Sequence, residues 1–157
     1  MQQNTHFLRQ AIALAYTNAE KGGRPFGAVV VRNGQVIAQA VNEMMTTNDP
    51  TAHAELLAIR AASQQLGSAN LAGCSVFASG HPCPMCMAAM RLAGINEVTY
   101  AYSNEDGAPY GLSTADIYAD LARPFSEQSM IIRHAPCRLD DRPDLYAHWK
   151  QQEQKGK

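Results

Sequence analysis

Thr51-Ala52-His53-Ala54-Glu55 and His81-Pro82-Cys83-Pro84-Met85-Cys86 are the two stretches around which the chain is organised. A histidine and two cysteines suit Zn²⁺, and three protein ligands leave the fourth tetrahedral position free for water. Glu55 lies two residues after His53, and a carboxylate beside a zinc-activated water can carry protons. We therefore predict a catalytic zinc site with His53, Cys83 and Cys86 as ligands and Glu55 as the acid/base residue.

Each fragment also has a simpler interpretation. A C-x-x-C pair alone is typical of structural zinc sites and of thiol redox pairs. A structural site would need a fourth ligand at similar spacing, but Cys74, His81 and Cys137 form no second C-x-x-C pair. A redox dithiol gives no reason for the His-x-Glu pair. A non-catalytic zinc-binding module remains as an alternative.

Length and composition indicate the class of protein. With 157 residues, 46% of them hydrophobic, the chain is expected to form one domain over residues 1–157. The net charge of −1 argues against a basic surface for nucleic acid, so we expect a small-molecule substrate. Cys74 and Cys137 are expected to be buried thiols, as in a reducing cytoplasm. No segment is apolar enough to predict a signal peptide or membrane span, so we expect a cytoplasmic protein.

The hydrophobic pattern predicts alternating helices and strands. Asn33-Gly34 is typical of a β-hairpin turn between two antiparallel strands. Two later strands joined through a helix should run parallel, so the sheet should be mixed. The zinc ligands fall near the starts of two helices. The expected helices are 4–20, 53–66, 84–93, 113–121 and 142–152, and the expected strands are 26–31, 35–41, 74–78, 97–102 and 129–133.

The motifs resemble those of a known superfamily. The segments Pro25-Phe26-Gly27-Ala28-Val29, Asn48 to Glu55 and Pro82 to Cys86 are similar to the cytidine deaminase-like superfamily, and most closely to its bacterial guanine deaminases. H-x-E followed by P-C-x-x-C is the signature of zinc-dependent nucleobase deaminases. The resemblance implies a three-layer α/β/α fold around a five-stranded mixed sheet, a Zn²⁺ cofactor and a homodimer.

The resemblance also implies roles for individual residues. His53, Cys83 and Cys86 correspond to zinc ligands and Glu55 to the proton shuttle. Asn42 corresponds to a contact with the substrate amide and Phe26 to a pocket wall. Ala54 is also expected to bind substrate. The implied reaction is hydrolytic deamination of a free purine base, with guanine giving xanthine and ammonia.

Two departures leave the substrate open. His81 stands where such enzymes commonly have glutamate, and the acidic residue that guanine deaminases carry before an Ile-Tyr pair has no clean match. Thr114 falls nearest its place, while Asp116 directly precedes Ile117-Tyr118 and is our candidate for substrate binding. Cytosine, cytidine, guanosine or an aminated triazine remain alternative substrates. A tRNA adenosine deaminase is disfavoured because base flipping from RNA normally accompanies a positive groove.

The C-terminal segment, about residues 142–157, combines aromatic side chains with a polar end. One interpretation is packing, with Trp149 docking the tail onto the core. The other is a lid or a segment swapped between subunits, because guanine deaminases that resemble this chain close their sites with the C-terminal tail. On the second interpretation Trp149 belongs to the substrate site.

Overall fold

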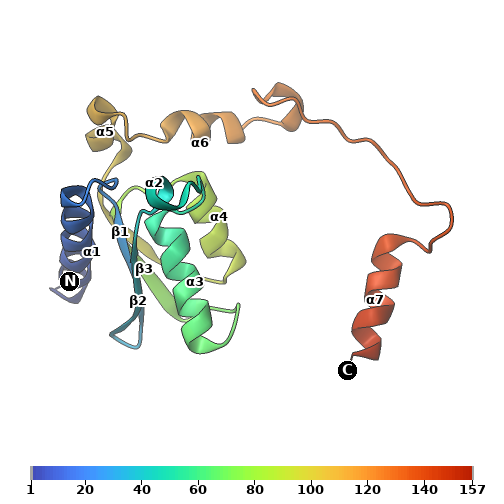
Figure 1. Ribbon diagram of the computed structural model, residues 1–157, viewed down its shortest axis with the longest axis horizontal. Coiled ribbons are helices and arrows are strands. Elements are labelled where there is room, and N and C mark those ends of the chain that lie inside the picture. The colour runs from blue at the N-terminus through green and yellow to red at the C-terminus, as the bar shows by residue number, and fades with distance from the viewer. Residues whose placement is uncertain (1, 157) are drawn as a thin grey trace. The chain divides into compact units, whose positions relative to one another are not determined.

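The computed structural model describes residues 2–156 and divides the chain into two compact units, Met1–Ala122 and Arg123–Lys157. The first unit contains the sheet and both predicted zinc-binding stretches (Figure 1). The second contains the C-terminal helix. The single deaminase domain expected over residues 1–157, with 142–157 as a lid or swapped segment, stays a prediction.

A mixed sheet of four strands forms the centre of the first unit. The strands are β1 (Gly27–Arg32), β2 (Gln35–Val41), β3 (Cys74–Gly80) and β4 (Val98–Tyr102), in the order β2-β1-β3-β4. Strand β1 is antiparallel to β2 and β3, whereas β3 and β4 are parallel. The prediction of a mixed sheet with a parallel pair is confirmed.

The prediction of a fifth strand is wrong for the described residues 2–156. Residues 129–133 have no strand structure, and Met130 and Ile131 are 71% and 76% exposed. Their β-branched and apolar side chains favour a strand, but a strand also needs a neighbour that pairs with its backbone N–H and C=O groups. The unit that contains this segment has no strand among its described residues.

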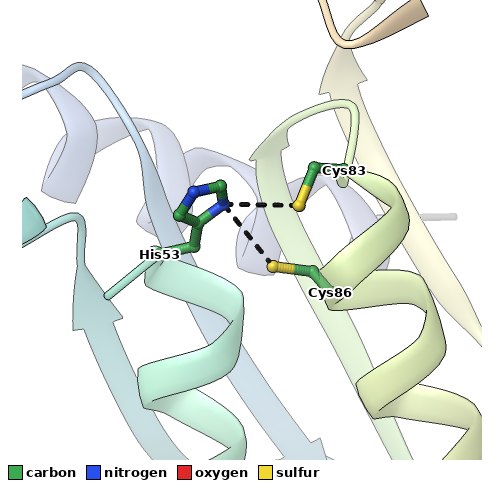
Figure 2. Close-up of side chains that lie close together, drawn as sticks. All are labelled: His53, Cys83 and Cys86. Atoms are coloured by element: carbon green, nitrogen blue, oxygen red, sulfur yellow. Dashed lines mark hydrogen bonds between the residues drawn. The ribbon is translucent and has the colours of Figure 1, made fainter. Parts of the chain in front are cut away.

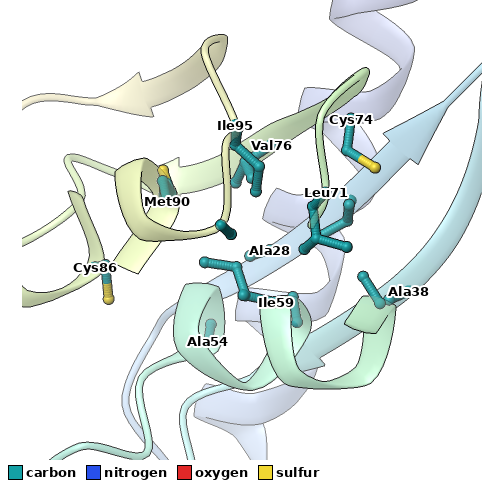
Figure 3. Packing of buried hydrophobic residues seen from close by; sticks show 14 of the residues in the cluster. Ala28, Ala38, Ala54, Ile59, Leu71, Cys74, Val76, Cys86, Met90 and Ile95 are labelled. Atoms are coloured by element: carbon teal, nitrogen blue, oxygen red, sulfur yellow. The ribbon is translucent and has the colours of Figure 1, made fainter. Parts of the chain in front are cut away.

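Helices cover both faces of the sheet, which confirms the three-layer architecture (Figure 1). Helix α1 (Gln2–Glu20) packs on one face, and α3 (Ala54–Leu66) and α4 (Pro84–Leu92) pack on the other. Alternate residues of β1 serve the two layers, because successive strand side chains point to opposite faces. Val29 and Val31 face α1, while Ala28 and Val30 join the cluster of α3 and α4 that Figure 3 shows.

Two glycine positions explain local features of this arrangement. Asn33 and Gly34 have φ values of 52° and 75°, as a type I′ hairpin turn requires, which confirms the predicted hairpin. At Gly27, a Cβ atom would lie 2.4 Å from the carbonyl oxygen of Ala11. Only glycine therefore lets α1 approach the start of β1 this closely.

The remaining helices are short. They are α2 (Met44–Thr47), α5 (Asn104–Gly107), α6 (Ala115–Leu121) and α7 (Leu145–Lys155), with 3₁₀ turns at Ala108–Tyr110 and Phe125–Glu127. Helix α7 was expected from residue 142. It begins later because the Asp144 side chain caps it, accepting a hydrogen bond from the backbone N–H of Ala147 at 3.3 Å. Among residues 2–156, no helix combines the length and the apolar character that crossing a membrane requires.

Candidate active site

His53 stands at the entrance to α3, held there by a compact turn. Asp49 Oδ1 accepts hydrogen bonds from the backbone N–H and the hydroxyl of Thr51, at 2.8 and 2.7 Å. These bonds lower the pKa of Asp49. The N–H of His53 donates to the carbonyl oxygen of Thr51 at 2.8 Å. His53 is the N-cap residue of α3 but its side chain makes no cap hydrogen bond, so the imidazole is free to serve the site.

The two cysteines belong to the start of α4. Cys83 is the N-cap residue, Pro84 occupies the first turn, and Cys86 lies one turn later with its side chain on the same side. Proline is tolerated in the first turn because the N–H it lacks would have no partner inside the helix. The helix dipole favours a thiolate at this end.

The three side chains converge between the starts of α3 and α4 (Figure 2). The Sγ atoms of Cys83 and Cys86 lie 3.4 and 3.8 Å from His53 Nδ1. Zinc with ordinary Zn–N and Zn–S bond lengths in tetrahedral geometry places nitrogen and sulfur about 3.6 Å apart. The observed spacings therefore fit zinc without rearrangement. Within residues 2–156, His53, Cys83 and Cys86 are the one group of at least three His, Cys, Asp or Glu residues whose ligand atoms all lie within 4.8 Å of one another.

The other two cysteines lie elsewhere. Cys74 is buried in the core beneath α3, as expected. Cys137 is exposed, so the prediction that it is buried is wrong. It occupies an extended segment, residues 131–139, whose side chains find no core to enter.

Charges at the ligand cluster favour metal binding. The Cys86 thiol donates a hydrogen bond to the Cys83 sulfur, and with a smaller contribution from His53 this lowers the pKa of Cys83 to about 4. Donation to Cys83 and burial raise the pKa of Cys86, so the pair shares one proton. The Cys83 thiolate in turn raises the pKa of His53. A divalent cation would displace these protons, because thiolates and neutral imidazole are the forms that bind metal.

Glu55 lies in the first turn of α3 and is only 6% exposed. Burial raises the pKa of its carboxyl to about 7, and the negative charge of Cys83 contributes in the same direction. Near neutral pH the carboxyl group can therefore both accept and return a proton, as a general acid/base requires.

A cavity of about 160 Å³ connects these groups to solvent. His53, Glu55 and Cys83 line this cavity, together with Phe26 and Asn42, which we predicted as pocket residues. This cavity is smaller than the roughly 300–1,000 Å³ of sites for drug-sized ligands, and a second cavity of about 650 Å³ shares Phe26 and His81 with it. The remaining lining residues are Arg24, Met44, His81, Gly111, Leu112, Ser113 and Thr114.

Asn42 is 5% exposed and its carboxamide has a fixed orientation. The backbone N–H of Met44 donates to Asn42 Oδ1 at 3.0 Å, so the Nδ2 group is the end available to a ligand. Asn18 Nδ2 donates to the carbonyl oxygens of Arg24 and Asn42, at 2.8 and 2.9 Å, and so joins the end of α1 to the wall of the cavity.

His81 lines the cavity as one member of an aromatic cluster. Its ring stacks on Tyr100 with centroids 4.7 Å apart and planes 9° from parallel, and Tyr118 lies 5.3 Å away at a tilt of 34°. The Tyr118 hydroxyl donates to the carbonyl oxygen of Pro82, next to Cys83. This cluster orients the His81 ring and holds α6 against the metal-binding turn.

The structure does not bring every predicted residue to the cavity. Ala54 is fully buried at the start of α3 but does not line the cavity. Asp116 is exposed and also lies outside the cavity wall, because the first turn of α6 directs it away from Thr114. This placement does not support a substrate contact for Asp116. Trp149 belongs to the second unit, and its place in the site stays a prediction.

Sequence reasoning missed Arg24, Met44 and the loop residues 111–113. No periodicity or motif marks these positions. The adjacency of Arg24 to the Pro25-Phe26 motif was the one available indication, whereas the loop reaches the cavity through tertiary contacts alone.

Comparison with known families identifies the first unit. The family model of the cytidine and deoxycytidylate deaminase zinc-binding region matches residues 1–102. The chain is 42% identical to a guanine deaminase from Bacillus subtilis over 125 residues, which cover 79% of this chain and 80% of the relative. It is 35% identical to a tRNA-specific adenosine deaminase from Agrobacterium fabrum over 154 residues, covering 90% of this chain and all of the relative.

Solved structures agree with these sequence matches. The crystal structure of a Bacillus subtilis guanine deaminase superposes with a TM-score of 0.82 at 34% identity, covering 98% of this chain and 94% of the other. The likeness thus includes the three layers and extends beyond the region that the family model matches.

Proposed function

The chain belongs to the cytidine and deoxycytidylate deaminase family defined by its zinc-binding region, and we propose that it hydrolyses guanine to xanthine and ammonia. The observation that carries this proposal is the convergence of His53, Cys83 and Cys86 at one cavity that Glu55 also lines. Zinc-dependent deaminases combine three protein ligands with a separate glutamate in this way. The match to guanine deaminases over most of both chains supports the choice of guanine.

In this reaction His53, Cys83 and Cys86 would hold zinc, which when bound would activate water as a nucleophile at neutral pH. Glu55 takes a proton from the attacking water onto its carboxylate. The water oxygen bonds to the ring carbon that bears the amine, and Glu55 delivers this first proton to the neighbouring ring nitrogen. Glu55 then takes the remaining proton from the new hydroxyl group and gives it to the amine, so that the carbon–nitrogen bond breaks, ammonia leaves and a carbonyl group forms. Guanine and water are consumed, and xanthine and ammonia are formed.

Asn42 and Phe26 orient the base. Asn42 presents N–H donors to the cavity because its oxygen is bonded to Met44, so it pairs with a carbonyl oxygen or an unprotonated ring nitrogen of the substrate. Phe26 offers an apolar wall for the flat ring, and its own ring packs against Gly80. A Cβ atom at Gly80 would lie 3.1 Å from Phe26 Cε1, so glycine leaves room for this packing.

A tRNA adenosine deaminase is the second candidate, because the Agrobacterium relative matches along its whole length. The net charge of −1 favours a free base, because it provides little attraction for RNA phosphates. Other small aminated heterocycles, namely cytosine, cytidine, guanosine and aminated triazines, remain alternative substrates.

We further propose a cytoplasmic homodimer in which residues 142–157 act as a lid or a swapped segment. The second unit exposes large apolar side chains that find no cover within it. Apolar surface of this kind commonly marks an interaction site. The residues concerned are Met130, Ile131, Leu139, Leu145, Tyr146 and Trp149. Light scattering after size-exclusion chromatography would test the dimer.

An ammonia-release screen tests the function. Zinc-loaded protein is assayed with guanine, adenine, cytosine, their nucleosides, an aminated triazine and a tRNA anticodon stem-loop, with chelator-treated protein as the control. We expect guanine to have the highest kcat/KM. A higher value for the stem-loop would identify a tRNA deaminase, and absence of ammonia from every compound would contradict deamination.

A further inference from the structure

Asn18, near the end of α1, is joined to two walls of the cavity that Glu55 lines. Its Nδ2 atom donates to the carbonyl oxygens of Arg24 and Asn42, at 2.8 and 2.9 Å. Carbonyl oxygens only accept hydrogen bonds, so the NH₂ end of the Asn18 carboxamide must face them. Arg24 and Asn42 line the cavity, whereas Asn18 does not. Asn18 therefore acts on the cavity through these two neighbours.

The two bonds meet at a place where separate parts of the chain come together. Arg24 lies in the loop before β1, and Asn42 directly follows β2. The N–H of Phe26 donates to the carbonyl oxygen of Arg24 at 2.9 Å, and the N–H of Asn42 donates to that of Phe26 at 3.1 Å. Asn18 completes this set of bonds, because a single NH₂ group joins the loop to the end of β2.

Both peptide groups of Asn42 are fixed by these contacts. Its N–H donates to Phe26, and its carbonyl oxygen accepts from Asn18. This carbonyl belongs to the peptide that leads through Glu43 to Met44, whose N–H donates to Asn42 Oδ1 at 3.0 Å. Rotation of the peptide would shift the Met44 N–H relative to Oδ1. The bond from Asn18 therefore helps to set the direction of the Asn42 Nδ2 group.

Gly23 leaves the space that the Asn18 carboxamide occupies. A Cβ atom at Gly23 would lie 2.6 Å from Asn18 Nδ2, and 2.9 Å from both Cγ and Oδ1. The φ angle of Gly23 is not positive, so its backbone conformation is open to other residues. The carboxamide of Asn18 is thus the feature that requires glycine here, and a methyl group would displace it from its two acceptors.

We propose that Asn18 is a positioning residue that orients the substrate-binding carboxamide of Asn42, an inference that rests on the proposed function. Asparagine side chains near a helix end commonly bond to the backbone of their own helix. Within residues 2–156 the Asn18 carboxamide instead bonds to Arg24 and Asn42 alone. Because Asn42 contacts the base before and during the reaction, loss of its orientation should raise KM and leave kcat nearly unchanged.

The test removes the Asn18 bonds in two ways. Asn18→Ala deletes the carboxamide, and Gly23→Ala keeps it but displaces it. Gln10→Ala is the matched control, because Gln10 also joins α1 to β2, with Nε2 donating to Gln39 Oε1 at 3.1 Å on the exposed surface. For each zinc-loaded protein we would measure kcat and KM for guanine and, by calorimetry, the Kd of xanthine, which does not react further.

We expect Asn18→Ala and Gly23→Ala to raise the KM for guanine and the Kd of xanthine by about 3- to 10-fold, as misplacing one neutral hydrogen bond implies. Their kcat should stay within about twofold of the wild type, and their zinc content should be unchanged. Gln10→Ala should stay within about twofold in every quantity. If Asn18→Ala fails to fold, Gly23→Ala provides the same comparison with the asparagine retained.

A double-mutant cycle separates positioning from a general effect on the fold. Asn42→Ala lacks the carboxamide that Asn18 is proposed to orient. In that background Asn18→Ala should change the KM for guanine by less than about twofold, because the two residues act as one unit. An equal change in KM in both backgrounds would show that Asn18 acts independently of Asn42 and would overturn the proposal.

The two proposals fail in different ways. Wild-type turnover of guanine combined with an unchanged KM and Kd in Asn18→Ala and Gly23→Ala would overturn the positioning role of Asn18. Wild-type protein that releases no ammonia from any compound in the screen would instead contradict the proposed function.

Discussion

Cys83 Sγ lies 3.4 Å from Nδ1 of His53, although 30 residues separate the two in the chain. They meet because each stands at the N-cap of a helix, and the two helices lie on the same face of the sheet with their starts together (Figure 2). Neither side chain is used to cap its helix, so both are available to a metal.

Metal binding should depend on Cys83 and not on Cys74. Cys83→Ala removes one of three ligands, and we expect the zinc content of the purified protein to fall from about one per chain to near zero. Cys137→Ser is the control, because this exposed thiol lies outside the ligand cluster and its loss should leave zinc unchanged. Equal loss of zinc in Cys74→Ser, measured by atomic absorption, would indicate a structural site with four ligands and argue against catalysis.

Asn42→Asp should weaken substrate binding without disturbing the fold. The substitution keeps an oxygen for the N–H of Met44 but replaces the Nδ2 donors with a second, charged oxygen. The acceptor atom of the substrate would then face a carboxylate oxygen and lose its hydrogen bond, which should raise the KM for guanine by about 5- to 150-fold. Asn70→Asp is a closely matched control, since Asn70 Oδ1 also accepts from the N–H two residues later, at 3.0 Å, on the exposed surface. Similar KM values for both variants would contradict the assigned contact.

Local signals in the sequence explain why the metal-binding residues could be predicted. His53, Cys83 and Cys86 occur in motifs whose spacing, with Pro84 in the first turn, already indicates helix starts. The hairpin was predictable for the same reason, because Asn33-Gly34 favours the required backbone conformation without help from the rest of the fold.

Features that depend on tertiary contacts could not be predicted in this way. The segment 129–133 has the composition of a strand, but the described residues of its own unit include no strand beside which it could lie. Asp116 was selected for its charge and its place before Ile117-Tyr118, yet the helical path turns it to solvent.

Tyr118 should make the stability of the folded protein fall with rising pH in the alkaline range. Burial, with contributions from the nearby Cys83 and Cys86, raises its pKa from 10.0 to about 12. The folded state therefore favours the protonated phenol of Tyr118. The contribution of this phenol to the free energy of unfolding is fully present below about pH 10 and is lost as the pH rises through about 12. The difference in urea midpoint between the wild type and Tyr118→Phe should be constant from pH 7 to 9 and shrink above pH 10. A difference that stays constant up to pH 12 would contradict this role.

Removing the C-terminal segment tests the proposed lid. Deletion from Asp144 onward eliminates α7, including Trp149, which is 56% exposed within its unit. If this segment excludes water from the site, the KM for guanine should rise or kcat should fall at least tenfold, while zinc content and the circular dichroism spectrum of the remaining chain are retained. Trp149→Ala should reproduce part of the effect. Parent activity in a folded truncated protein would leave packing as the function of Trp149.

The most direct test of the account is the rate of ammonia release from guanine by zinc-loaded wild type and Glu55→Gln. Glutamine keeps the size of the buried side chain but cannot exchange the proton, and proton transfer typically contributes about 10²- to 10⁴-fold to a rate. We predict that the wild type releases ammonia and xanthine in equal amounts, and that Glu55→Gln retains its zinc while kcat falls by about 10²- to 10⁴-fold. A fall of less than about tenfold at full zinc occupancy would contradict the central claim that Glu55 transfers the proton.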